Sequence, residues 1–110
     1  MQKSSGQSSG RTSGVVVRDD PGAHRYAAWL DGRVAGFITY ETADRLVTLT
    51  HTEVPSEFEG RGVGSALVRA SLDEIRASGR EVVPVCPFVR SWIDRNPEYA
   101  DLVHQGSASG

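Results

Sequence analysis

Three glycines alternate through a short turn between a β-rich segment and an amphipathic helix. Gly60, Gly62 and Gly64 follow residues 46–54, which are rich in β-branched side chains. Apolar residues then recur at three- and four-residue steps, which predicts a helix over residues 62–78. Because glycine has no side chain, such a turn exposes consecutive backbone N–H groups, and a helix start adds unpaired donors and the positive end of a dipole. The pattern favours a site for a phosphate or pyrophosphate.

This turn has other interpretations, and the residues present do not match the sequence motifs that two of them require. A P-loop requires a Gly-Lys-Ser/Thr ending, which does not follow here. A dinucleotide-binding turn requires G-x-G-x-x-G after a parallel sheet, whereas the third glycine comes one step early, at Gly64. The alternative that stays open is a flexible turn that lets a helix approach a sheet closely without any ligand.

Four extended segments precede the glycine turn, and they span residues 15–17, 24–30, 33–40 and 46–54. Asp31-Gly32 joins the second to the third and is the strongest short hairpin signal in a sequence. Residues 41–45 are predicted as the next turn. Period-two alternation in the fourth segment predicts one face made of Val47, Leu49, His51 and Glu53. The aromatic residues expected to pack on the sheet faces are Trp29, Phe37 and Tyr40.

Beyond the helix, the chain predicts one more strand and one more helix. Residues 81–85 are apolar and β-branched, and a strand–helix–strand order makes this strand parallel to the fourth. Residues 88–95 predict a short helix that Asn96-Pro97 ends, with Trp92 and Tyr99 as core anchors. The predicted fold class is therefore α/β (α+β): a mostly antiparallel central sheet, one long helix after strand four, a parallel fifth strand and a short C-terminal helix.

The chain has 110 residues, which fits one domain. Residues 1–14 and 105–110 are rich in Ser and Gly and are predicted as disordered tails, so the foldable domain spans residues 15–104. A net charge of -2 with no basic stripe argues against nucleic-acid binding. One cysteine, no apolar run of about 18 residues and no apolar leader predict a cytoplasmic protein that does not engage a membrane.

The order of these elements around the glycine turn resembles a known family. Antiparallel strands, a polar link and the run Gly60-Arg61-Gly62-Val63-Gly64 resemble motif A of the GNAT acetyltransferase superfamily, written Gln/Arg-x-x-Gly-x-Gly/Ala. Gly62 and Gly64 match its two small positions. Glu59 stands where Gln or Arg is expected, and an acidic side chain would repel a pyrophosphate unless it turned away. The resemblance implies that backbone amides, with Arg61, carry the binding while Glu59 faces solvent.

A narrower resemblance covers the C-terminal half. The runs Pro84-Val85-Cys86-Pro87-Phe88-Val89, Trp92-Ile93 and Asn96-Pro97-Glu98-Tyr99 are similar to those of abbreviated YjdJ-type GNAT proteins. These are minimal single-domain members that lack the helical pair between the first two strands of larger relatives. Here only residues 19–23 separate these strands. The resemblance therefore implies a minimal GNAT fold over almost all of the foldable chain.

In this family acetyl-CoA lies in a gap where the strand before the glycine turn and the strand after the helix splay apart. The resemblance implies that the pantetheine arm adds to the edge of the former strand, and that the turn amides hold the pyrophosphate. Asn96 would touch the cofactor, although Asn-Pro after a helix is also a plain stop signal. The cofactor-binding residues implied are Thr52, Val54, Gly60, Arg61, Gly62, Val63, Gly64, Ser65 and Asn96.

Three residues are candidates for catalysis. Cys86 ends a buried strand at the expected gap, and the abbreviated proteins carry a cysteine at the matching place, so it is predicted to accept the acyl group or contact the thioester. His51 is predicted as its base, and Glu53 as a general base acting directly or through water. The structural alternatives are a small buried hydrophobe for Cys86 and a hydrogen-bonded core histidine for His51. No zinc-like spacing occurs, so no metal is predicted.

The resemblance implies an acetyl-CoA-dependent N-acetyltransferase acting on an unidentified small or peptide amine, as a monomer or weak dimer. Two alternatives stay open. The first is a CoA-binding or acyl-CoA-binding module with little turnover, favoured by the missing helical pair. The second is an interaction protein that kept the scaffold and lost the cofactor, favoured by Glu59.

Overall fold

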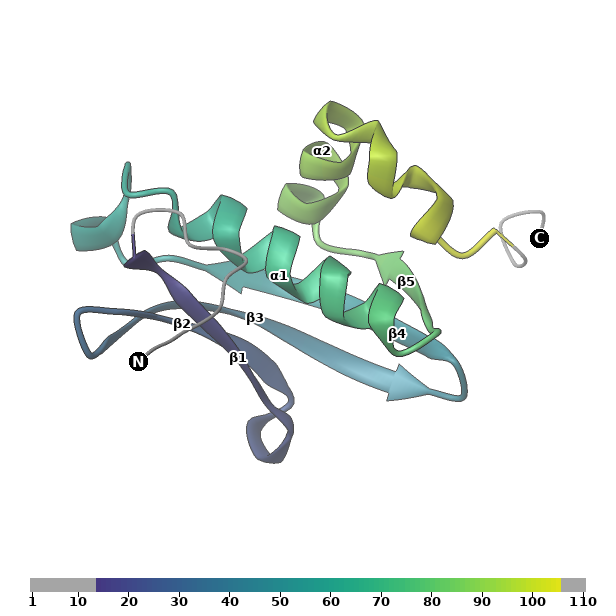
Figure 1. Ribbon diagram of the computed structural model, residues 1–110, viewed down its shortest axis with the longest axis horizontal. Coiled ribbons are helices and arrows are strands. Elements are labelled where there is room, and N and C mark those ends of the chain that lie inside the picture. The colour runs from purple at the N-terminus through teal and green to yellow at the C-terminus, as the bar shows by residue number, and fades with distance from the viewer. Residues whose placement is uncertain (1–13, 106–110) are drawn as a thin grey trace, which may run out of the picture.

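The computed structural model describes residues 14–105. Its elements follow the predicted order, with a sheet before the long helix and a strand and a second helix after it (Figure 1). The strands are β1 (Val16–Asp20), β2 (Arg25–Leu30), β3 (Arg33–Ala43), β4 (Leu46–Glu53) and β5 (Glu81–Pro84). The helices are α1 (Val63–Ala77) and α2 (Pro87–Arg95), with 3₁₀ turns η3 (Pro21–Ala23), η4 (Ser56–Phe58) and η5 (Pro97–Leu102). The predicted tails lie outside the described residues, apart from Gly14 and Gln105.

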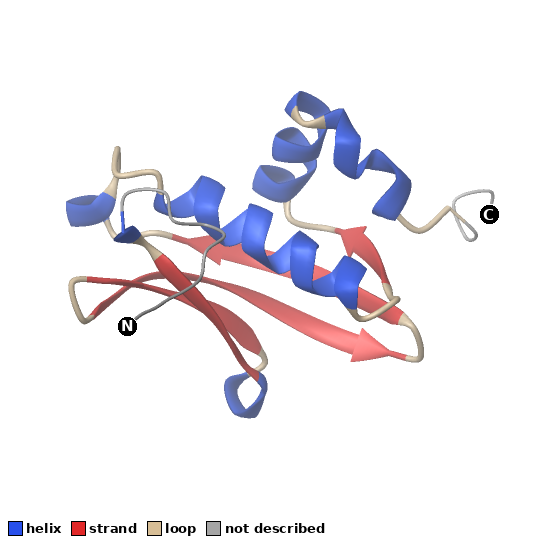
Figure 2. Cartoon of the chain, in the orientation of Figure 1, coloured by secondary structure: helices blue, strands red, loops and turns tan. Residues whose placement is uncertain are grey.

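The five strands form one sheet in chain order, β1-β2-β3-β4-β5. The first four pair antiparallel, and β4 and β5 pair parallel through the crossover made by α1. Figures 1 and 2 show both α-helices on the same side of this sheet. The predicted fold class is confirmed.

Helix α1 packs on the sheet through its apolar stripe. Leu67, Val68 and Leu72 have no exposed surface, and they meet Ile38 and Leu49 of the sheet, which are equally buried. Gly79 follows the helix with a φ of 78°, as a C-terminal glycine in the left-handed region does. The stripe predicted from the three- and four-residue spacing is thus the core face of the helix.

Helix α2 and η5 are anchored by the two aromatic residues that the sequence predicts for this role. Trp92 is 2% exposed, and its Nε1–H donates a hydrogen bond of 2.8 Å to Ser65 Oγ at the start of α1. The Tyr99 hydroxyl donates to Asp73 Oδ1 at 2.7 Å. The first bond holds α2 against the start of α1, where the glycine turn lies, and the second holds η5 against the middle of α1.

The hairpin between β3 and β4 is longer than predicted. Glu41, Thr42 and Ala43 belong to β3 and pair with β4, so the turn is reduced to Asp44 and Arg45. Asp44 has a φ of 56°, which a two-residue hairpin turn requires and which aspartate tolerates. The prediction of a turn over residues 41–45 is wrong because polar residues at the exposed end of a hairpin have the composition of a loop.

A β-bulge in β4 changes which side chains face α1. Thr39 of β3 pairs with His51 while its neighbour Tyr40 pairs with Leu49, so Thr50 is an extra residue in β4. Before the bulge Leu49 is buried beneath α1. After it the exposed side chains are those of His51 and Glu53. The predicted common face of Val47, Leu49, His51 and Glu53 is wrong, because one extra residue shifts every later side chain to the other face.

The face of the sheet opposite α1, here called the outer face, has no α-helix on it among residues 14–105 (Figure 2). Of the aromatic residues predicted to pack on the sheet, Tyr40 is buried and Phe37 is half-buried, but Trp29 is 38% exposed. The expectation for Trp29 is therefore wrong, since nothing in the described chain covers it.

Gly36 of β3 lies where β4, α1 and the following loop come together. A Cβ atom at this position would be 2.8 Å from the Glu53 carbonyl oxygen and 3.2 Å from Val63 Cγ1. We expect Gly36→Ala to lower the free energy of unfolding by roughly 1–3 kcal/mol, because backbone must move to accommodate the methyl group. Chemical denaturation measures this loss. Gly22→Ala is the control, with no neighbour nearer than 3.9 Å, and equal stability of the two variants would contradict the prediction.

None of the helices in the described part of the chain is long and apolar enough to cross a lipid bilayer.

Candidate active site

The parallel strands β4 and β5 separate before β4 ends. Their pairing stops at Leu49 and Pro84, and the next two amides, of Val85 and Cys86, both donate to the Leu49 carbonyl at 3.1 and 3.0 Å. The chain then turns away into α2, whereas β4 continues beside β3 as far as Glu53. From Thr50 onward, the edge of β4 facing β5 has no strand partner within the described residues. The two strands therefore frame a gap, and the bulge at Thr50 lies where it opens.

The glycine turn leaves the start of α1 uncapped. Gly60 and Gly62 have φ angles of 83° and 79°, which side-chain-bearing residues rarely adopt. The Arg61 amide donates to the Phe58 carbonyl, and the Ala66 amide donates to the Gly62 carbonyl. Within residues 14–105, no hydrogen bond uses the four amides between them, those of Gly62, Val63, Gly64 and Ser65. These donors, together with the helix dipole, suit an anion.

A cavity of about 390 Å³ joins the glycine turn to the splayed strand. Its walls come from the end of β4, the turn, the first residues of α1 and the start of α2. The residues lining it are Thr52, Val54, Phe58, Glu59, Gly60, Gly62, Val63, Gly64, Ser65 and Phe88. Most of the residues that the sequence predicts for cofactor binding thus lie together around one cavity.

Two of the predicted cofactor-binding residues are not among the residues that line this cavity. Arg61 is exposed at the turn. Asn96 lies at the far end of α2, where its side-chain amide donates to the Trp92 carbonyl at 2.8 Å and so caps the helix. The arrangement of Asn96 matches the alternative of a helix stop signal.

Phe88 is a cavity residue that the sequence did not single out. It stands one position off the buried stripe of α2, which is formed by Val89, Trp92 and Ile93, and its side chain is 41% exposed. A Cβ atom on Gly64 would be 2.8 Å from the end of the Phe88 ring. Gly64 therefore makes room for this ring as well as exposing its own amide. An exposed aromatic residue beside the apolar stripe of a short helix is the signal that could have found it.

Glu59 is exposed and lines the cavity beside the glycine turn. Glu59 therefore brings an acidic residue to the same cavity that Gly62, Val63, Gly64 and Ser65 line, and the solvent-facing orientation of its carboxylate stays a prediction.

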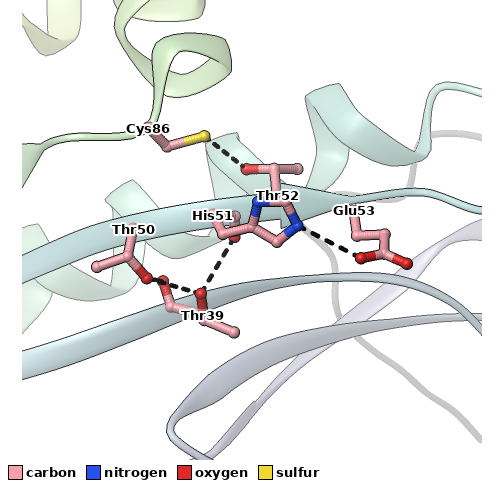
Figure 3. Close-up of polar contacts among 6 residues, drawn as sticks. All are labelled: Thr39, Thr50, His51, Thr52, Glu53 and Cys86. Carbon is pink, nitrogen blue, oxygen red and sulfur yellow. Dashed lines mark hydrogen bonds and ion pairs between the residues drawn. The ribbon is translucent and has the colours of Figure 1, made fainter.

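Cys86 lies at the point where the gap opens and immediately before α2. Its side chain is 4% exposed, and its sulfur is 3.3 Å from Thr52 Oγ1. Figure 3 shows the two side chains pointing toward each other. Burial alone would raise the pKa of this thiol. Hydrogen bonds from Thr52 and from the amides of Val89 and Phe88 more than offset burial, so the pKa is lowered from its ordinary value.

His51 and Glu53 lie on the outer face rather than beside the thiol. Their side chains are 62% and 58% exposed, and His51 Nε2 is 3.3 Å from Glu53 Oε1 (Figure 3). The side-chain partner of Cys86 is Thr52, not His51. The structure therefore separates the predicted residues into a buried pair, Cys86 and Thr52, and an exposed pair, His51 and Glu53, on either side of β4.

A family model for GCN5-related N-acetyltransferases matches residues 25–102, which include the splayed strands, the glycine turn and both helices. The chain belongs to the GCN5-related N-acetyltransferase family. Its curated relatives include Protein NATD1 of Gallus gallus, which is 34% identical over 82% of this chain and 84% of that protein. Protein NATD1 of Homo sapiens is also 34% identical, over 76% of this chain and 75% of that protein.

Solved structures agree with the family at the level of the fold. A GCN5-like protein from Staphylococcus aureus superposes with a TM-score of 0.62 at 21% identity, covering 81% of this chain and 87% of that one. A ribosomal-protein-alanine N-acetyltransferase from Brucella melitensis gives 0.51 at 22% identity, covering 74% of this chain and 61% of that one. The narrower resemblance to the YjdJ-type subtype stays a prediction.

The chemistry available to this GCN5-related chain comes from amides, hydroxyls, one thiol and the exposed pair His51 and Glu53. No group of three or more His, Cys, Asp or Glu side chains in the described residues is arranged to hold a metal ion.

Thr52→Val tests whether the Thr52 hydroxyl holds down the pKa of Cys86. Because this hydrogen bond favours the thiolate, we expect its loss to raise the thiol pKa, so that reaction with methyl methanethiosulfonate rises at a higher pH than in the parent protein. The rate of this thiol modification as a function of pH measures the shift. Thr48→Val, on the same strand before the bulge, is the matched control. An unchanged pH profile in Thr52→Val would show that the amides of Phe88 and Val89 suffice.

Proposed function

We propose that this chain is an acetyl-CoA-dependent N-acetyltransferase. The observation that carries the proposal is the set of free amides from Gly62 to Ser65, which open on a cavity of about 390 Å³ beside a splayed strand. Four free N–H groups at the positive end of a 15-residue helix suit a pyrophosphate, which acetyl-CoA carries. Family membership supports the same cofactor.

The cavity also suits the rest of the donor. Thr52 and Val54 line it from the end of β4, whose edge toward β5 is unpaired in the described chain and can bind a pantetheine amide as a further strand would. Phe58 and Phe88 supply apolar contact area. The proposed cofactor-binding residues are Thr52, Val54, Phe58, Gly60, Gly62, Val63, Gly64, Ser65 and Phe88.

Acetyl-CoA supplies an activated acyl group as a thioester. In the proposed reaction the acceptor nitrogen forms an amide bond to the acetyl carbon, the carbon–sulfur bond breaks, and CoA leaves as a thiolate. The acceptor loses a proton, for which Glu53 and His51 are the exposed bases beside the gap. Cys86 stands on the buried side of β4, where its lowered pKa suits either transient acylation or contact with the thioester.

Calorimetry with acetyl-CoA tests this proposal. We expect binding with a dissociation constant between about 1 μM and 1 mM, the range usual for enzyme substrates. Release of free thiol in the presence of an amine panel then measures transfer. Absence of binding at millimolar acetyl-CoA would reject the proposal and leave the scaffold without its cofactor.

One observation favours a second candidate, a CoA-binding module with little turnover. Only the three residues of η3, Pro21–Ala23, lie in helical conformation between β1 and β2. The helical pair that larger relatives carry at this place is therefore missing here. Such a module would bind acetyl-CoA equally well but release no thiol with any amine.

A further inference from the structure

The outer face of the sheet carries a continuous row of exposed apolar side chains. Val16 pairs with Trp29 and Trp29 pairs with Val34, so these residues of β1, β2 and β3 lie side by side. They are 48%, 38% and 36% exposed. They are three of the five large apolar residues left exposed in the described chain. A row of this kind marks a surface that binds something apolar.

This row continues into the exposed pair at the end of β4. Phe37 is half-buried on the outer face, and its cross-strand partner is Glu53, which contacts His51. Arg25 lies over the Phe37 ring at 5.2 Å, and its Nε is 3.6 Å from Asp20, so its charge is offset. The exposed Arg18 lies on the same face, where it pairs with Ala27, the neighbour of Phe37, so a ligand that runs from Glu53 to Val16 passes beside one cation.

The dimensions of the face indicate the size of this ligand. Adjacent strands are about 4.8 Å apart, so the distance from β4 to β1 is roughly 14 Å. An extended peptide rises about 3.3 Å per residue and covers this distance with its first four or five residues. A small amine at Glu53 would leave Trp29 and Val16 bare.

The exposure of His51 and Glu53 indicates which amine is used. Neither side chain is buried, so the site does not desolvate an ammonium group to make it lose its proton. An α-amine has a pKa near 7.8 and a lysine side chain one near 10.4, so at neutral pH the neutral form is roughly 300-fold more abundant for the α-amine. A site whose bases are exposed to solvent therefore favours the α-amine.

We propose that the acceptor is the N-terminal α-amine of a peptide with apolar side chains among its first residues, docked along Phe37, Trp29, Val34 and Val16 of the outer face. This inference rests on the proposed acetyltransferase function. In the reaction the neutral α-nitrogen attacks the acetyl carbon and forms the amide bond, the carbon–sulfur bond breaks and CoA leaves as the thiolate, and the one proton that the nitrogen loses passes to Glu53 or His51 and then to water.

The test compares three acceptors at pH 7.5 with acetyl-CoA: a peptide with a free N-terminus and leucines at positions 2 to 4, the same peptide with serines there, and glycinamide. We expect kcat/KM for the leucine peptide to exceed the other two by about tenfold or more, as for a buried interface anchor. Trp29→Ser should remove this advantage and leave glycinamide turnover and acetyl-CoA affinity unchanged. Trp29→Phe should keep it, and Ala100→Ser is the remote control.

The outcomes separate the two proposals. Turnover of glycinamide without a preference for the leucine peptide, or a preference that survives Trp29→Ser, overturns the inference alone. Faster acetylation of an N-formylated lysine peptide overturns the choice of the α-amine. A dimer that Trp29→Ser dissociates, with no peptide preference, assigns the face to a second copy and overturns the inference. Absence of acetyl-CoA binding overturns the proposed function and the inference with it.

Discussion

Replacing Ser65 by aspartate is expected to weaken acetyl-CoA binding about 100-fold while leaving the protein as stable as before or slightly more so. Ser65 is exposed in the first turn of α1, its amide is one of the four free donors, and it lines the cavity. A carboxylate about 5 Å from a diphosphate costs on the order of 3 kcal/mol at an effective dielectric constant of 20. The same carboxylate near a helix N-terminus stabilises the helix by roughly 0.3–1 kcal/mol.

Because Ser65→Asp is expected to lower the affinity for acetyl-CoA but not the stability of the fold, a general loss of structure cannot imitate the result. Calorimetry with acetyl-CoA measures the affinity, and thermal denaturation without ligand measures the stability. Ser65→Asn is the matched control, because it has the same shape without the charge and still offers an acceptor to Trp92 Nε1. Equal affinity of the aspartate and asparagine variants would mean that the pyrophosphate does not bind at this helix start.

Cys86→Ala is expected to lower turnover on the order of 100-fold or more, with the dissociation constant of acetyl-CoA within about threefold of the parent value. Cys86 lies where the gap opens, with its pKa lowered by Thr52 and the amides of Phe88 and Val89 despite burial. A thiolate there is available at a lower pH than for an ordinary cysteine, so activity should rise with pH through this lowered pKa and then level off.

Two measurements separate catalysis from packing at Cys86. Intact mass after incubation with acetyl-CoA alone shows whether one acetyl group is retained, and alkylation at Cys86 shows where. Cys86→Ser keeps the size and a hydrogen-bonding partner for Thr52 but is a weak nucleophile, so it should be as inactive as alanine. Full turnover in either variant would assign the cysteine to the core as a small buried hydrophobe.

Local features of the chain were read correctly from the sequence. The end of α1 before Gly79 and the parallel pairing of β5 both follow from residues within a few positions of one another. The glycine turn could be predicted because free amides at a helix start are a local consequence of helix geometry. Phe88 was not predicted as a cavity residue, because its place over Gly64 depends on how α2 packs on α1.

Three of the predictions made from the sequence were wrong because they concern contacts between distant parts of the chain. The longer hairpin, the exposed Trp29 and the reversed face of His51 each depend on a partner strand or on a layer that is absent from the described chain. A bulge such as that at Thr50 leaves the alternating letters unchanged. With the bulge in place, Leu49 lies beneath α1 and Thr52 points to Cys86, contacts that residues distant in the sequence provide.

By itself, the sequence determined the family, the order of the elements and the free amides at the start of α1, because glycine turns, helix ends and apolar periodicity act over a few residues. The tertiary structure decided that Cys86 meets Thr52, that His51 and Glu53 lie on the opposite face, and that no α-helix of residues 14–105 covers this face. Those outcomes depend on cross-strand register, and register is set by the summed burial of the whole sheet rather than by any one segment.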